Sequence, residues 1–313
     1  GRPARLPAMR LLVTGGTGFI GAPLRRRLAQ RGHELLVLTR APAAHRAEPG
    51  VRFLPLDADA WRRELAGAGG VINLAGEPIA AGRWTARRKL AIRDSRMETA
   101  RRLVEALAAM PQRPAALLNA SAIGYYGARS DEELTESDGA GNGFLAETCQ
   151  AWEAEARRAE ALGVRVVRLR IGLVLGRGGG ALAKMTPPFR AFVGGPLGSG
   201  RQWMSWVHRD DVVGLIEWAL AHAECSGALN VTAPEPVRMA ALCRALGRAL
   251  RRPSWAPVPA PVLRLLLGEM AELLVTGQRV VPRAALQTGY PFRFPSLAGA
   301  LEECLGHGAD DGN

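Results

Sequence analysis

The chain has 313 residues, of which 48% are hydrophobic and 22% charged, so it is long and apolar enough for one large or two smaller globular domains. It holds no run of about 20 apolar residues and no signal-peptide pattern, so we expect neither a membrane-spanning helix nor secretion. Its four cysteines and five histidines are scattered, which argues against a zinc site or a disulfide framework and is typical of a cytoplasmic protein.

The net charge of +12 raises the question of a nucleic-acid partner. Nearly all of the 41 basic residues are Arg, with Lys only at 89 and 184, and many stand in pairs interleaved with Glu on predicted helices. This pattern is typical of solvated helix faces, and neither a helix-turn-helix pattern nor an aromatic platform accompanies it in the sequence. We therefore expect no nucleic-acid partner, although the charge suits a ligand that carries phosphate.

Short apolar runs alternate with helical patterns along the first 175 residues. The runs are apolar on both sides, as in strands buried inside a parallel sheet, and they predict strands at residues 10–13, 34–38, 51–56, 70–74, 115–120 and 165–169. Helices are predicted between them, at residues 18–31, 87–109 and 145–162. Repeated strand–helix–strand units predict an α/β fold with a doubly wound parallel sheet.

From Gly176 the pattern changes to a loop-rich stretch with many glycines. Beyond it we expect a helix from about residue 210, a further strand at 227–231, and helices at 239–250 and 260–274. We expect two domains, at residues 9–175 with the strand at 227–231, and mainly at residues 176–305. The two ends, residues 1–8 and 306–313, are expected to be flexible.

A glycine-rich turn, Thr14-Gly-Gly-Thr-Gly-Phe-Ile-Gly21, follows the first predicted strand and opens the first predicted helix. Gly15 permits a sharp turn, Gly18 lets the backbone approach a pyrophosphate, and Gly21 lets the helix pack close to the sheet. The helix N-terminus adds free N–H groups and a positive dipole. The turn therefore predicts a dinucleotide site, with contacts from Gly15, Thr17, Gly18, Phe19, Ile20 and Gly21.

The second predicted strand ends at Leu38-Thr39-Arg40. Sites that prefer NAD usually carry an acidic residue there, which binds the 2′-hydroxyl of the ribose, whereas an Arg accommodates a 2′-phosphate. Arg40 and the Thr39 hydroxyl therefore favour NADP(H) as the cofactor. Arg is abundant in this chain, so the absence of Asp or Glu carries as much weight as the Arg. Asp57, after the third strand, is either an adenine contact or an exposed loop carboxylate.

Together these features resemble the extended short-chain dehydrogenase/reductase superfamily, whose signature is T-G-x-x-G-x-x-G, and within it the atypical SDR39U1-type epimerase family. The resemblance covers roughly residues 9–305 and is carried by Asn73-Leu-Ala-Gly-Glu77, Ser95-Arg96, Ser121-Ala-Ile-Gly-Tyr-Tyr-Gly127, Arg170-Ile-Gly-Leu-Val-Leu-Gly-Arg-Gly-Gly-Gly180, Trp206-Val-His-Arg-Asp-Asp211, Val231-Thr-Ala-Pro-Glu-Pro-Val237, Gly268-Glu-Met-Ala-Glu272 and Gly277-Gln-Arg-Val-Val-Pro282.

That resemblance implies a Rossmann domain that binds NADP(H) and a smaller C-terminal substrate domain, with cofactor and substrate meeting between them. By its motifs it also implies that the cofactor touches a second set of residues, which are Thr39, Arg40, Leu74, Ala75, Gly76, Arg96 and Val174. Arg96 has a plainer interpretation as a solvated side chain on an amphipathic helix.

Most members of the superfamily use a Tyr-x-x-x-Lys pair, in which Lys lowers the pKa of the Tyr and the Tyr transfers a proton. This chain lacks the pair, because none of Tyr125, Tyr126 and Tyr290 is followed by Lys four residues on. Where the superfamily would place it, the chain reads Gly143-Phe-Leu-Ala-Glu-Thr-Cys149. The departure leaves cofactor binding intact and removes the usual acid and base.

Three residues remain as catalytic candidates, namely Ser121, Tyr125 and Tyr126, and each also has a structural interpretation. Glu147 is a weaker candidate acid or base, on the first turn of a predicted helix. His208 is interpreted chiefly as a structural residue near the domain interface. Two tryptophans of the C-terminal half either line the substrate pocket or belong to the core, namely Trp203 and Trp206.

Three functions fit these observations. The first is an NADP(H)-dependent oxidoreductase that acts on a small carbonyl or hydroxyl substrate with an unusual acid or base. The second is a regulator or redox sensor that binds NADP(H) without turnover, and the third is a nucleotide-sugar epimerase or dehydratase, against which the missing pair weighs most. We expect a small-molecule substrate, no membrane partner and no metal, and the oligomeric state is open, with a homodimer as one arrangement.

Overall fold

A computed structural model describes residues 7–57 and 60–306. The expected flexible ends therefore fall almost wholly outside the described residues, as do positions 58 and 59 beside Asp57. Within the described ranges, no helix combines the length and the apolar character that crossing a bilayer requires.

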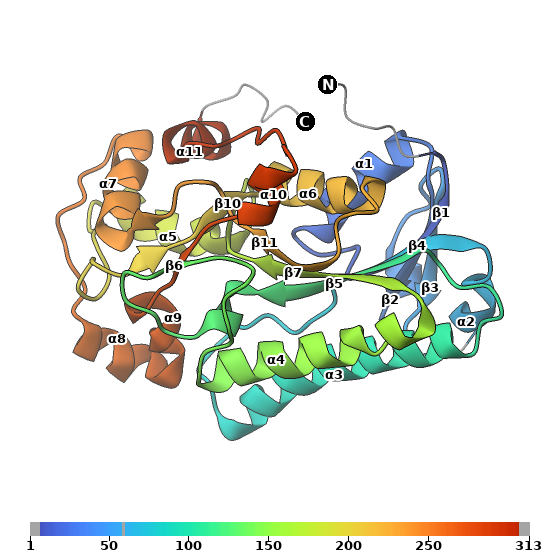
Figure 1. Ribbon diagram of the computed structural model, residues 1–313. Helices are drawn as coiled ribbons and strands as arrows, with labels where there is room; N and C mark the ends of the chain where they lie inside the picture. Colours follow the sequence, from blue (N-terminus) through green and yellow to red (C-terminus); the bar gives the residue numbers. More distant parts are fainter. Residues whose placement is uncertain (1–6, 58–59, 307–313) are drawn as a thin grey trace.

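The centre of the molecule is a seven-stranded parallel sheet (Figure 1). Its strand order is β11-β7-β5-β4-β1-β2-β3, which changes direction between β1 and β4 and is that of a doubly wound fold. The predicted strands are all present, including the one at 227–231. Their bounds are β1 (Arg10–Thr14), β2 (Glu34–Thr39), β3 (Val51–Pro55), β4 (Ala68–Asn73), β5 (Ala116–Ala122), β7 (Arg165–Ile171) and β11 (Gly227–Val231).

Helices cover both faces of this sheet because its strands are apolar on both sides (Figure 1). In β1, Leu11 and Val13 face a core shared with α1 (Gly21–Gln30) and α6 (Arg209–Ala221). Leu12 points the opposite way, into a core shared with α3 (Ala86–Ala108). The fourth helix, α4 (Phe144–Arg157), lies against α3 and the end of β5.

A third core lies beyond the carboxyl edge of the sheet and is built by the C-terminal half. It joins β8 (Leu173–Leu175), α5 (Gly180–Arg190), β10 (Trp206–His208), α7 (Met239–Leu250) and α11 (Leu297–Leu305). Between β10 and α7 the chain returns to the large sheet, where α6 and β11 join its core. The C-terminal half therefore contributes an edge strand and a covering helix to the large sheet, besides its own core.

Two predicted helices are too long. The helix expected at 145–162 ends at Arg157, and a separate 3-10 turn at Glu160–Leu162 follows it. Residues 260–274 were expected to be continuous, but the chain forms α8 (Ala260–Leu267), a 3-10 turn η4 (Gly268–Ala271) and α9 (Glu272–Val275). The break falls at Gly268, whose φ of +61° is incompatible with a right-handed helix. The first helix also begins at Gly21, not at Gly18, because the preceding residues form the glycine turn.

The remaining elements are short and connect these layers. They are η1 (Pro42–Ala44), α2 (Trp61–Glu64), η2 (Ile123–Tyr126), β6 (Glu133–Leu134), η3 (Glu160–Leu162), β9 (Trp203–Met204), β12 (Val237–Arg238), β13 (Arg279–Val280) and α10 (Arg283–Gln287). Three two-stranded pairings hold the loops beyond the large sheet. They join β10 with β8, β12 with β9 and β13 with β6.

The close packing of α1 on the turn makes Gly21 a sensitive position. A Cβ there would overlap the carbonyl oxygen of Gly15, which is backbone and has no rotamer to change. We expect Gly21→Ala to lower the free energy of unfolding by at least about 2 kcal/mol, measured by denaturant titration. Gly139→Ala is the matched control, since a Cβ there meets nothing within 4 Å. Equal stability of the two variants would contradict this packing.

Candidate functional site

The glycine turn lies directly against the end of β4. Gly15 has a φ of +68°, and a Cβ on it would stand 2.6 Å from the carbonyl carbon of Leu74. Only glycine allows this approach, because a side chain on Gly15 would collide with backbone atoms of Leu74 and Ala75, which have no rotamer to change. Gly18, by contrast, is exposed, and a Cβ there would meet only the Gly15 oxygen at 3.4 Å. The outer side of the turn at Gly18 is therefore open to a ligand.

The N-terminus of α1 has no cap of its own. Ile20 occupies the N-cap position without a side-chain hydrogen bond, and the first turn holds no acidic residue. The amide groups of Phe19 and Ile20 have no backbone acceptor in the described part of the chain. Free amides and the positive end of the helix dipole together favour an anion at this place. The turn thus fits the pyrophosphate of a dinucleotide, as its sequence predicts.

A buried chain of polar side chains fixes the strand ends beneath the turn. The Thr14 hydroxyl donates to Asn73 Oδ1 (2.5 Å), and Asn73 Nδ2 donates to Asn119 Oδ1 (2.6 Å). Asn73 Oδ1 also accepts from the amide of Ala75 (3.3 Å), so it shapes the loop after β4. Sequence analysis missed Asn119 as a positioning residue, although a buried Asn in an apolar strand was the available signal.

Arg40 lies at the end of β2, where it was predicted. Its side chain is 84% exposed and its guanidinium contacts the carboxylate of Glu77 (Nη1 to Oε1, 3.2 Å). The other oxygen of that carboxylate contacts Arg88 Nη1 at 3.3 Å. One carboxylate is thus held between two arginines, and a phosphate group suits the same arrangement. Sequence analysis did not single out Arg88.

Arg96, on α3, extends its side chain into the loop that follows β4. Its Nη1 donates to the carbonyls of Glu77 (3.1 Å) and Ile92 (2.8 Å), and its guanidinium lies over the ring of Trp152. A Cβ on Gly76 would stand 3.0 Å from the Arg96 guanidinium. Burial lowers the pKa of Arg96 from its ordinary value. The solvated interpretation is wrong for this residue, which supports the loop that holds Leu74, Ala75 and Gly76.

Phe19 links the turn to the C-terminal half. Its ring packs so closely on the Gly176–Gly180 loop that a Cβ on Gly179 would stand 2.6 Å from it. Arg209 covers the ring from another side, at 4.9 Å from its centroid. Val174 precedes this loop, in β8, and packs at the edge of the core around α1 and α6. The glycine run is therefore explained by close packing against an aromatic side chain.

Ser121, at the end of β5, is buried and donates to Glu153 Oε1 (2.7 Å). That carboxylate forms a two-pronged ion pair with Arg170, at 2.9 and 3.0 Å, and both side chains are 3% exposed. Burial alone lowers the pKa of Arg170, but the bonds and charge of Glu153 raise it above its ordinary value. The Ser121 hydroxyl is thus anchored to a buried ion pair.

The two neighbouring tyrosines lie in different environments. Tyr126 is fully buried, and its hydroxyl contacts the Thr135 carbonyl, Asn230 Oδ1 and Arg170 Nη1 at 2.7 to 2.9 Å. Tyr125 is partly exposed, its hydroxyl has no partner among the described residues, and the Arg170 guanidinium lies 3.5 Å from its ring centroid. Tyr125 is therefore the phenol of this loop that is free to meet a ligand.

The place of the usual Tyr–Lys pair is taken by apolar packing. Leu145 and Cys149 lie one turn apart on α4 and face Gly124, since a Cβ there would stand 3.3 Å from Leu145 Cβ and 3.9 Å from Cys149 Sγ. Burial raises the pKa of the Cys149 thiol to about 11, so it is neutral at physiological pH. Neither side chain supplies a cation or a hydroxyl.

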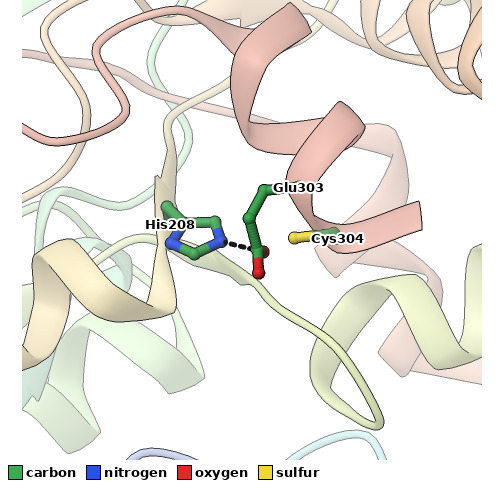
Figure 2. A group of neighbouring side chains, drawn as sticks. All are labelled: His208, Glu303 and Cys304. Carbon is green, nitrogen blue, oxygen red and sulfur yellow. Dashed lines mark hydrogen bonds and ion pairs between the residues drawn. The ribbon is translucent and has the colours of Figure 1, made fainter. Parts of the chain in front are cut away.

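Figure 2 shows His208 from β10 pointing at Glu303 and Cys304 from α11. The three donor atoms lie within 4.8 Å of one another, close enough to suggest a metal site. His208 Nδ1, however, accepts from the amide of Asp210 (3.1 Å), so the proton of the neutral ring sits on Nε2, 2.8 Å from Glu303 Oε2. A metal at Nε2 would need that proton removed. The group therefore docks α11 onto the start of α6, a structural role.

The other predicted residues lie apart from the turn. Asp57 and Glu147 are exposed. Trp206 is fully buried and donates from Nε1 to the Glu235 carbonyl, so it belongs to the core. Trp203 is half-buried, beneath the guanidinium of Arg238.

The chain is similar to known proteins over most of its length. The model of the NAD dependent epimerase/dehydratase family matches residues 11–232, and that of a domain of unknown function, DUF1731, matches residues 258–304. An epimerase family protein SDR39U1 homolog of Arabidopsis thaliana, chloroplastic, is 42% identical over 95% of this chain and 87% of its own length. The epimerase family protein YfhF of Bacillus subtilis is 37% identical over 95% of this chain and 98% of its own.

Among solved structures, the human epimerase family protein SDR39U1 with NADPH has a TM-score of 0.83 and is 36% identical. The match covers 95% of this chain and 99% of that one. The similarity therefore extends over both halves of the molecule, including the C-terminal core.

The buried environment of Tyr126 predicts a pH effect on stability. Burial raises its pKa from 10.0 to about 12. Between these values the folded protein keeps the proton that the unfolded chain has lost, so stability falls as pH rises, by about 1.4 kcal/mol for each pKa unit. We expect Tyr126→Phe to be less stable at neutral pH but to lose less stability from pH 10 to 12, in denaturant titrations. Tyr125→Phe is the control, and an unchanged slope in Tyr126→Phe would contradict the assignment.

Proposed function

Because the chain belongs to the NAD dependent epimerase/dehydratase family, we propose that it binds NADP(H) and reduces or oxidises a small carbonyl or hydroxyl substrate. The observation that carries the proposal is the uncapped, electropositive N-terminus of α1 behind the open turn at Gly18. The NADPH in the human relative of the same fold supports the choice of cofactor. When bound, this cofactor supplies or accepts a hydride.

The residues predicted from the sequence to contact the cofactor are also the ones proposed here to bind it. The turn from Thr17 to Gly21 would hold the pyrophosphate through the free amides of Phe19 and Ile20, and Thr39 and Arg40 would hold the 2′-phosphate. Arg88 joins them, because it already shares one carboxylate with Arg40. Glu77 is then an internal anion that occupies the arginines when no 2′-phosphate is present.

Tyr125 is proposed to give or take the proton of the substrate oxygen. Its free hydroxyl meets the first requirement of an acid or base, which is access. The Arg170 guanidinium lies over its ring, 3.5 Å from the ring centroid, and so places a positive charge beside the phenol. Glu153 fixes Arg170 in that position, and Ser121 is held by the same carboxylate. The proposed catalytic set is therefore Tyr125 with Ser121, with Tyr126 and Arg170 positioning the loop.

A second function, binding of NADP(H) without turnover, is favoured by one observation. Leu145 and Cys149 fill the place of the usual Tyr–Lys pair with side chains that cannot replace it at neutral pH. An epimerase or dehydratase of nucleotide sugars, as in the name of the family, needs a proton or hydride to be removed and returned, and the same observation weighs against it. We also propose that residues 9–175, with the strand at 227–231, form the nucleotide domain and that residues 176–305 mainly form the substrate domain.

The cofactor assignment predicts a change of selectivity. Arg40→Gln is expected to weaken NADPH binding about 10-fold to 100-fold, since a charge-assisted contact is lost, and to leave NADH binding unchanged. Isothermal titration calorimetry with both cofactors measures this. Glu77→Gln is the matched variant and is expected to tighten NADPH binding, because the competing carboxylate is removed. An equal loss of NADPH and NADH affinity in Arg40→Gln would refute the 2′-phosphate assignment.

Turnover separates the two functions. The protein is mixed with NADPH and a panel of aldehydes, ketones and quinones, and the absorbance of the reduced nicotinamide is followed. We expect oxidation with at least one substrate class, and a fall in kcat of about 100-fold in Tyr125→Phe with little change in NADPH affinity. Tight NADPH binding with no oxidation across the panel would replace the enzyme by the non-catalytic function.

A further inference from the structure

Four arginines surround a concavity at the C-terminal end of α7, at the opposite side of the molecule from α1 (Figure 1). The concavity has a volume of about 380 Å³ and is lined by Arg244, Gly247, Arg248, Arg251, Arg252 and Ser254. This volume falls within the range of about 300–1,000 Å³ that small-molecule sites occupy. Neither the glycine turn nor the proposed catalytic loop contributes to it.

The fold builds this concavity by bending the chain back at the end of α7. Arg244 and Arg248 are one helical turn apart and share a face. Arg251 adopts a left-handed conformation, with φ of +54°, and the amide of Arg252 then donates to the carbonyl of Gly247 at 2.8 Å. Gly247 is needed here, because a Cβ would stand 2.7 Å from the Arg252 carbonyl oxygen.

These arginines lack counter-charges within the described structure. None of the four forms an ion pair with a described carboxylate. Arg248 lies in the last turn of α7, where the helix dipole favours a cation, but this accounts for only one of the four. The Ser254 hydroxyl, which lines the concavity, is buried and has no described partner. Unpaired guanidinium groups beside a free hydroxyl favour a ligand with several phosphate oxygens.

Two exposed aromatic side chains adjoin the arginines. Trp255 follows Ser254 directly and is 66% exposed, and its Nε1 donates to the carbonyl of Phe192 (2.9 Å). Phe192 is itself 53% exposed, and Arg252 lies over its ring at 4.4 Å. The sequence separates these two aromatics by more than sixty positions, and the fold places them side by side. An exposed indole beside guanidinium groups is suited to stacking on a nucleobase.

We propose that this concavity is a second nucleotide site, which binds a nucleoside polyphosphate with its phosphates on Arg244, Arg248 and Arg251 and its base on Trp255. The concavity is open to solvent, and its lining is confined to the short segment from Arg244 to Ser254. This small extent favours a free nucleotide over a nucleic-acid strand, which needs an extended groove. The site is independent of the proposed cofactor site and does not require turnover. A ligand there would contact the C-terminal end of α7 and the segment that follows it, and α7 packs in the C-terminal core.

The test is calorimetric titration of the whole protein, kept saturated with NADPH so that the glycine turn is blocked. ATP and inorganic tripolyphosphate are the probes. We expect ATP to bind at one equivalent and more tightly than tripolyphosphate, and Trp255→Ala to abolish that difference. Arg248→Gln/Arg251→Gln is expected to weaken both probes at least 10-fold. These positions are exposed and support no described contact of the core, so the variant is expected to fold.

A charge-matched control separates a site from general attraction. Arg26→Gln/Arg63→Gln removes two exposed arginines elsewhere and is expected to leave both affinities unchanged. Equal weakening in the control, or no ATP binding by the unaltered protein, would overturn the proposal. If tripolyphosphate binds as tightly as ATP and Trp255→Ala has no effect, the surface is an anion site without a base contact. If a single-stranded decanucleotide binds and ATP does not, the surface binds a nucleic-acid strand. Either result also overturns it.

Discussion

The molecule depends on the approach of two stretches of backbone, the turn at Gly15 and the end of β4 at Leu74. They come so close that no side chain on Gly15 fits between them. A side chain on Gly21 is excluded in the same way, because it would overlap the carbonyl oxygen of Gly15. Because of this approach, α1 begins at the sheet edge with its amides pointing outward. The chain Thr14–Asn73–Asn119 then ties the ends of β1 and β4 to the middle of β5, so that the loops after β1 and β4 start from a fixed edge.

The second constraint is the buried ion pair of Glu153 and Arg170. Buried pairs of this kind add little net stability, but removal of one partner leaves an unpaired charge in the core. Here the pair organises the loop after β5, since Ser121, Tyr125 and Tyr126 each contact one of its members. The helix α4, which lacks the usual Tyr–Lys pair, thus carries the carboxylate of Glu153 one turn after Cys149.

Phe19 connects the glycine turn to the C-terminal half. Its ring lies against the Gly176–Gly180 loop and beneath Arg209, so it packs at the start of both α5 and α6. The His208–Glu303 contact in turn fixes α11 to the start of α6. The proposed nucleotide concavity lies on the far side of this same core, at the end of α7.

The sequence by itself determined the sheet, the glycine turn and the absence of the usual catalytic pair. Apolar runs on both strand faces and glycines at fixed offsets are local signals, and they need no knowledge of distant residues. It did not reveal the break at Gly268, since an isolated Gly is tolerated in many helices. Only the tertiary structure separated Tyr125 from Tyr126, paired Arg40 with Glu77 and brought Phe192 to Trp255. Those relations depend on side chains far apart in the chain, where burial and charge are decided by what the fold places beside them.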